Sequence, residues 1–155
     1  MKINNLQSIV CLVIFFLFAN QAYAADWKFL AQSVTGNLYY DKSSIKKVDD
    51  NIIRVLTKTV YNEYGKKNGV SILKIMGKNP NNPDILNHEE IAFEFDRANE
   101  KYRISAMSFC DKEGRVLHSL PKFTGKAEDI PPESFAERLK NKIYSFEKNS
   151  QRKKK

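Results

Sequence analysis

The chain offers little cysteine or histidine for catalysis or metal binding, since its 155 residues include only two of each. A thiolate nucleophile needs a base such as histidine nearby, so an enzyme hypothesis would rest on Cys110. The alternative is that Cys110 is a small buried residue, and we favour burial because free cysteine is among the most often buried residue types. We therefore predict no catalytic residue and no enzymatic activity.

Metal and cofactor sites also lack the necessary residue spacing. His88 and His118 lie on different predicted elements, so a metal site would need both to converge with a carboxylate such as Glu89. Glu89 and Glu90 are neighbours in a predicted strand and point to opposite faces, which argues against a carboxylate pair that shares a proton. The chain has no glycine-rich phosphate loop and no G-x-S-x-G motif. We predict no metal and no cofactor.

The positive charge is concentrated at the carboxyl end. The formal net charge is +8, but between residues 25 and 147 there are 20 basic and 18 acidic residues. This near balance argues against a nucleic-acid-binding protein. Residues 148–155 contain no apolar residue and are predicted to be a disordered tail that either binds an anionic surface or is merely solvated. The basic residues of this tail are Lys148, Arg152, Lys153, Lys154 and Lys155.

The amino terminus has the pattern of a secretory signal peptide. Lys2 precedes an apolar run of 11 residues at 9–19, and Ala22-Tyr23-Ala24 follows as a small-residue cleavage pattern. The run is too short to span a membrane, which takes about 20 apolar residues. We therefore expect cleavage after Ala24, a single domain at 25–147, and export to the periplasm, the cell surface or the medium. No transmembrane span remains after cleavage, and the oligomeric state is left open.

Strand patterns dominate the mature chain. Short apolar runs at 27–33 and 38–41, separated by a segment that contains Gly36, predict an opening hairpin. Residues 52–62 are rich in β-branched side chains and predict a strand that is half-buried on both faces. Residues 69–76 fit either a short helix, which we favour, or a strand.

The clearest signal is a hairpin at 91–107. Phe93 and Phe95 alternate with acidic residues before a four-residue loop at 97–100, and Tyr102 and Ile104 alternate with polar residues after it. Pairing position 96 with 101 places Phe95 opposite Tyr102, Phe93 opposite Ile104 and Glu94 opposite Arg103. A slip by one residue would expose the aromatic side chains, so the pattern selects this register.

The chain ends in a second turn and a helix. Asp111-Lys112-Glu113-Gly114 predicts a turn that returns the chain along residues 115–120. The segment Ile130-Pro131-Pro132-Glu133 is expected to begin a helix, with Glu133 at the positive end of its dipole. Four apolar residues, Phe135, Leu139, Ile143 and Phe146, would form one stripe on that helix. The fold class predicted is α+β: a single antiparallel β-sheet of about six strands in a meander, with the carboxy-terminal helix packed on one face.

Aromatic residues are the other candidates for binding. A sheet surface rich in tyrosine suits recognition, because the ring is apolar and the hydroxyl can form hydrogen bonds. The same residues could instead pack in the core, which we favour. The tyrosines considered are Tyr39, Tyr40, Tyr61, Tyr64 and Tyr102.

Several local strings, in this order, resemble the surface-adhesin E-like family of exported bacterial proteins. They are Trp27-Lys28-Phe29-Leu30, Leu38-Tyr39-Tyr40-Asp41 with Ser44-Ile45, Arg54-Val55, Lys58-Thr59-Val60-Tyr61, Phe95-Asp96, Lys101-Tyr102-Arg103-Ile104, Asp111-Lys112-Glu113-Gly114 and Ile130-Pro131-Pro132-Glu133-Ser134. The resemblance implies the same fold class and, for some members, binding to extracellular proteins. It also implies a disulfide tether to the last helix, which this chain lacks: Arg97 occupies the first cysteine position, and no cysteine follows Cys110.

These observations favour an exported, non-enzymatic binding protein of the bacterial cell envelope. Its partner would be an extracellular or envelope protein or an anionic polysaccharide. The alternative is a periplasmic protein that binds a small molecule or an envelope component between the helix and the sheet.

Overall fold

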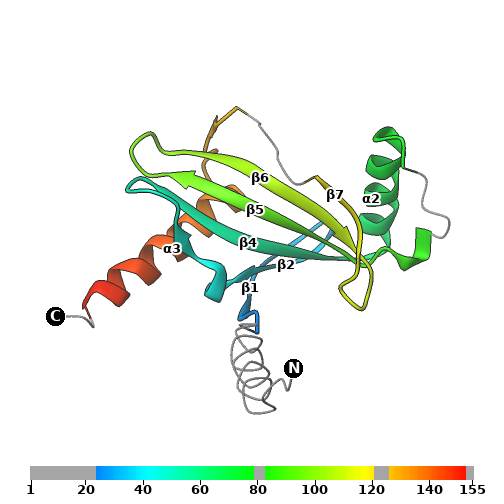
Figure 1. Cartoon of the computed structure of the whole chain (residues 1–155), viewed down its shortest axis with the longest axis horizontal. Coiled ribbons are helices and arrows are strands. Elements are labelled where there is room, and N and C mark those ends of the chain that lie inside the picture. Colours follow the sequence, from blue (N-terminus) through cyan, green and yellow to red (C-terminus); the bar gives the residue numbers. More distant parts are fainter. Residues whose placement is uncertain (1–23, 79–82, 121–125, 153–155) are drawn as a thin grey trace, which may run out of the picture.

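The computed structural model describes residues 24–78, 83–120 and 126–152; residues 1–23 of the predicted signal peptide (1–24) and Lys153 to Lys155 lie outside the described residues. Eight strands form one antiparallel sheet in the order β1-β2-β4-β5-β6-β7, with β3 paired to β4 and β8 to β6 (Figure 1). The predicted fold class is confirmed: α+β, with a meander sheet and a carboxy-terminal helix. The strands are β1 Trp27–Ser33, β2 Gly36–Asp41, β3 Lys46–Lys47, β4 Ile52–Tyr61, β5 His88–Asp96, β6 Lys101–Cys110, β7 Val116–Leu120 and β8 Glu128–Asp129.

The described helices are two α-helices, α2 (Glu63–Ile75) and α3 (Phe135–Arg152), and two short 3-10 helices, η1 (Lys42–Ser44) and η2 (Pro83–Ile85). In Figure 1, α3 lies near the end of the sheet that carries the β5–β6 hairpin, and α2 lies at the opposite end. In the described parts of the chain, no helix is both long and apolar enough to cross a membrane.

The β5–β6 hairpin has the predicted register. Phe95 pairs with Tyr102, Glu94 with Arg103, and Phe93 with Ile104. A bulge after position 92 then shifts the pairing by one residue, so that Ala92 lies opposite Ala106. Because side chains alternate between faces, the extra residue in β6 keeps Tyr102 and Ile104, which precede the bulge, on the same face as Met107 and Phe109, which follow it.

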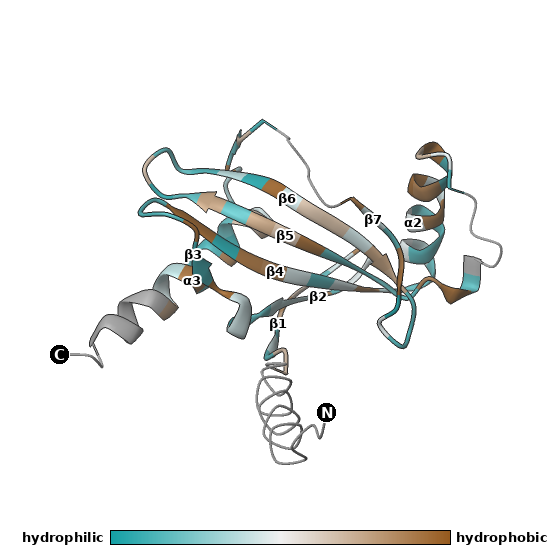
Figure 2. Cartoon of the chain, viewed as in Figure 1, coloured by the Kyte–Doolittle hydropathy of each residue, from teal (hydrophilic) through white to brown (hydrophobic). Residues whose placement is uncertain are grey.

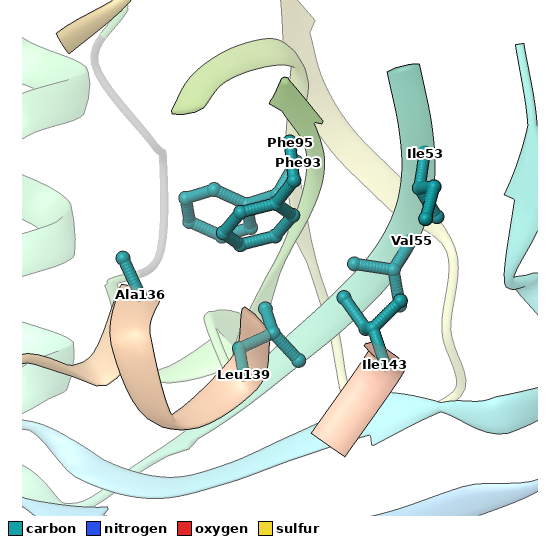
Figure 3. Close-up of a cluster of buried hydrophobic side chains, with 7 residues drawn as sticks. All are labelled: Ile53, Val55, Phe93, Phe95, Ala136, Leu139 and Ile143. Atoms are coloured by element: carbon teal, nitrogen blue, oxygen red, sulfur yellow. The ribbon is translucent and has the colours of Figure 1, made fainter. Parts of the chain in front are cut away.

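The α3 helix covers one face of the sheet through the predicted apolar stripe. Leu139 and Ile143 are fully buried against Ile53 and Val55 of β4 and the two phenylalanines of β5 (Figure 3). Phe135 packs at the rim, with its ring centroid 5.6 Å from that of Phe93. These contacts bury an uninterrupted apolar surface, which stabilises the docked helix.

The ends of α3 differ from the predicted ones. Glu133 lies outside the helix with a positive φ of 59°, so its predicted role in the first turn was wrong. Ser134 caps the helix instead: its Oγ accepts a hydrogen bond from the Glu137 amide at 3.2 Å, and the Glu137 carboxylate accepts one from the Glu133 amide at 2.8 Å. The helix also continues to Arg152, beyond residue 147, where the domain was predicted to end.

A cation–π contact joins the β5–β6 loop to α3. The guanidinium carbon of Arg97 lies 4.7 Å from the ring centroid of Tyr144. Arg97 occupies the position where the resemblance implied a tethering cysteine. A non-covalent contact thus connects the same two elements.

The α2 helix packs on the same face as α3 and is longer than the predicted segment 69–76. Leu73 is buried with Phe109 of β6 in a second core cluster, which Tyr61 partly covers. A Cβ at Gly65 would lie 2.0 Å from the carbonyl oxygen of Thr35, and a Cβ at Gly69 would lie 2.7 Å from a side-chain carbon of Leu86. Glycine at both positions therefore permits the close approach of α2 to the sheet.

Candidate functional site

The two faces of the sheet have different surroundings. In β4, Ile53, Val55, Thr57 and Thr59 are buried on the face that both α-helices cover. The intervening residues of β4 and their cross-strand neighbours lie on the opposite face, which no described α-helix covers and which we call the open face. Figure 2 shows hydrophilic residues interspersed with hydrophobic ones along these strands.

The structure brings Cys110 and His88 together on the open face but does not activate the thiol. The two residues are directly opposite in the β5–β6 register. Cys110 is nearly fully buried, and this burial, together with the carboxylates of Glu90 and Asp111, raises the pKa of its thiol to about 11. A thiol with that pKa stays protonated at neutral pH and is a poor nucleophile.

Neither histidine is arranged as a base for Cys110. Burial and the nearby Lys58 ammonium lower the pKa of His88, which makes its ring a weaker base than an ordinary histidine. Its Nε2 lies 3.8 Å from a Glu90 oxygen. His118 is paired with Phe109, so it lies on the helix-covered face, away from Cys110. In the three described ranges, no group of three His, Cys, Asp or Glu side chains could hold a metal ion.

An ion-pair cluster around the buried Glu94 carboxylate lies on the open face, near the β5–β6 loop. The Glu94 carboxylate accepts hydrogen bonds from Arg54 Nε at 2.9 Å and Arg103 Nε at 2.8 Å, and the second nitrogens of both guanidinium groups also contact it. Burial alone would raise the pKa of Glu94, but the two arginines outweigh burial and hold the pKa below its ordinary value. This cluster connects β4, β5 and β6, which gives it a structural role.

A cavity of about 240 Å³ lies beside this cluster near the β5–β6 loop. Its charged lining residues are two acids, Glu94 and Asp96, and two bases, Lys101 and Arg103. They already interact with neighbouring side chains, and their charges balance. The cavity therefore has no net charge with which to attract an ionic ligand.

A partly buried carboxylate, Glu89, lies on the helix-covered face. The Tyr61 hydroxyl donates a hydrogen bond of 2.8 Å to Glu89. Burial raises the pKa of Glu89, although hydrogen bonds from Tyr61 and Thr59 partly oppose the rise. Glu89 and Glu90 point to opposite faces, as predicted, so they do not share a proton.

The tyrosines that were candidates for one binding face are separated. Tyr39 is on the open face, whereas Tyr40 and Tyr102 pack against the α3 core and Tyr61 against the α2 core. Tyr64 is 63% exposed on α2. These residues do not form a common binding face, and three of them mainly contribute to packing.

A different set of aromatic residues gathers on the open face at the β1–β2 hairpin. Phe29 and Tyr39 are directly opposite in the register, and their rings meet edge to face with centroids 5.8 Å apart. Trp27 lies two residues before Phe29, and the Lys58 ammonium is 4.0 Å from its ring centroid. We call Trp27, Phe29 and Tyr39 the aromatic strip. Alternation of Trp27 and Phe29 in a predicted strand could have indicated it, but their shared face with Tyr39 depends on the pairing of β1 with β2.

The basic residues at the carboxyl end are only partly described. Lys148 and Arg152 belong to the last turns of α3 rather than to a tail outside the helix. Lys153, Lys154 and Lys155 lie outside the described residues. Their binding to an anionic surface stays a prediction.

No protein-family model, no curated protein and no solved structure matches this chain. The resemblance to surface-adhesin E-like proteins therefore stays a prediction from the local strings. Any functional assignment must come from the chain's own side chains. Among these, the aromatic strip is the feature that packing within the sheet explains least.

Proposed function

We propose that this chain is an exported, non-enzymatic binding protein of the bacterial cell envelope, and that it binds an extracellular or envelope macromolecule through the open face of its sheet. The observation that carries the proposal is the aromatic strip. Phe29 is 59% exposed even though its ring contacts the ring of Tyr39. It lies on the open face, which no described α-helix covers.

Exposed aromatic side chains on a regular sheet are suited to recognition. A partner that covers Phe29 would gain about 25 cal/mol for each Å² of apolar surface removed from water. Tyrosine and tryptophan add polar atoms that can form hydrogen bonds with the partner. Because the strip is built on paired strands, its geometry exists before the partner arrives, which reduces the entropy lost on binding.

Other observations support a binding role over catalysis and over a ligand between helix and sheet. The one thiol of the described chain is buried and protonated at neutral pH. The space between α3 and the sheet is filled by the fully buried side chains of Leu139, Ile143 and Phe95. The local strings that resemble surface-adhesin E-like proteins agree with the same role, and the signal-peptide pattern supports export.

Binding of the mature protein to isolated cell envelopes tests this proposal. We expect wild-type protein to sediment with envelopes and Phe29→Ser to lose most of this binding. Tyr64→Ser is the matched control, because Tyr64 is exposed to a similar extent but lies on α2. Equal binding by both variants would contradict the proposal.

The location of the protein is tested separately on intact cells. An external protease or antibody that reaches the protein, but not a periplasmic control protein, would support an adhesin at the cell surface. Protection until the outer envelope is broken would instead place the binding partner in the periplasm.

A further inference from the structure

We propose that the aromatic strip binds an uncharged glycan chain. This inference rests on the proposed function and specifies its ligand class. It is carried by three features of the open face: exposed ring surface, unengaged side-chain amides beside it, and a balance of charges.

The rings and the amides form one line along the β1–β2 hairpin. The register places Gln32 opposite Asn37, on the same face as Phe29 and Tyr39, because the bulge between positions 29 and 31 adds one residue. Both amide residues are exposed. Within the described part of the chain, neither side-chain amide has a hydrogen-bond partner.

The chemistry of this line fits a sugar chain. The faces of a pyranose ring carry C–H groups that stack on aromatic rings, and its hydroxyl groups pair with amides that both donate and accept hydrogen bonds. The line from Trp27 to Gln32 extends about 16 Å along the strand, which suits an extended chain of several sugars. β1 is an edge strand of the described sheet, so a long polymer could pass beyond the strip in that direction.

The charges of the open face favour an uncharged ligand over an acidic one. Glu94 is shared by Arg54 and Arg103, and the pairing of β4 with β5 places Lys58 opposite Glu90. In the strand registers, this face carries five bases and five acids: Lys46, Arg54, Lys58, Lys101 and Arg103, with Asp41, Glu90, Glu94, Asp96 and Asp129. The Lys58 ammonium beside the strip is also engaged with the ring of Trp27. An acidic polysaccharide would need an excess of cations on this face, and these pairings remove that excess.

The chain contains a single tryptophan, so tryptophan emission reports directly on the strip. We would titrate the mature protein with the hexamer of β-1,4-linked N-acetylglucosamine, the hexamer of β-1,4-linked glucose, and heparin. We expect a saturable change in the emission of Trp27 with at least one neutral hexamer, and this change should persist at high salt. Phe29→Ser and Tyr39→Ser should each raise Kd by about tenfold, equivalent to the loss of one favourable ring contact. Tyr64→Ser should leave Kd unchanged.

Three results would overturn the inference. If neither hexamer changes the emission while envelope binding still depends on Phe29, the proposed function stands and its ligand is not a neutral glycan. A response to heparin alone that salt suppresses would assign an acidic ligand. An emission change with protein concentration alone, absent in Phe29→Ser, would show that a second copy of the chain covers the strip.

Discussion

Glu94→Gln should destabilise the fold, because it removes the negative charge between two arginines while preserving side-chain size. Glu94 is only 3% exposed, whereas the Arg54 and Arg103 side chains are 38% and 49% exposed. Removing one partner of a fully buried ion pair costs about 3 to 5 kcal/mol. Because water partly solvates both guanidinium groups, we expect a smaller loss of about 2 kcal/mol in the free energy of unfolding at pH 7.

The loss should depend on pH in a defined direction. The two arginines hold the folded-state pKa of Glu94 below its ordinary value of 4.5. The ionised carboxylate therefore stabilises the fold above the pKa of the unfolded chain, and this stabilisation disappears as the pH falls through the folded-state pKa. As the pH falls below 4.5 and through the lowered folded-state pKa, the wild-type side chain also becomes neutral, so the difference between wild type and Glu94→Gln should shrink.

Urea unfolding at a series of pH values, followed by the emission of Trp27, measures this difference. Glu113→Gln is the control, since Glu113 is 63% exposed and its partner Arg115 is 76% exposed. The control should change the free energy of unfolding by less than about 0.5 kcal/mol. A loss for Glu94→Gln no larger than that of the control, or one that is constant from pH 7 to pH 3, would refute the stabilising role of the cluster.

Three further predictions follow from buried groups. Leu139→Ala should lower the free energy of unfolding by about 2 to 5 kcal/mol, because Leu139 is fully buried between α3 and the sheet; a loss below about 1 kcal/mol in urea unfolding would contradict this packing. Burial raises the pKa of Glu89, so the folded wild type binds more protons than the unfolded chain and loses stability as the pH rises above about 4.5. Glu89→Gln should therefore gain stability relative to wild type between pH 4 and pH 7, and a constant difference would exclude this effect. Cys110 should react with a thiol reagent only after unfolding; labelling of the folded protein at the rate of the unfolded chain would restore the nucleophile hypothesis.

The sequence was sufficient to predict the elements in which apolar and polar residues follow a strict periodic pattern. The β5–β6 register followed from apolar residues that face one another, such as Phe95 and Tyr102, and the structure has the same pairs. The stripe of Leu139 and Ile143 likewise identified the face of α3 that is buried. In both cases, burial of one face left few alternatives.

Other features depend on contacts between distant parts of the chain. The first two turns of α2 contain Gly65 and Gly69, which lower helix propensity, and their role is visible only from the close approach of Thr35 and Leu86. The common face of the aromatic strip required the register of β1 with β2, and the position of Gln32 on that face depends on a bulge that short-range alternation does not reveal. Tyr40 and Tyr39 are adjacent in sequence yet lie on opposite faces, so composition alone could not separate core from surface.

The central claim is that the aromatic strip contacts the partner in the living cell. A photo-crosslinking analogue of phenylalanine placed at position 29 tests this claim directly, with the same analogue at position 64 on α2 as the matched control. We predict that light produces a crosslinked, higher-mass species of the exported protein from position 29 and not from position 64. Crosslinking from position 64 alone, or from neither position in cells that make the folded protein, would contradict binding through the open face.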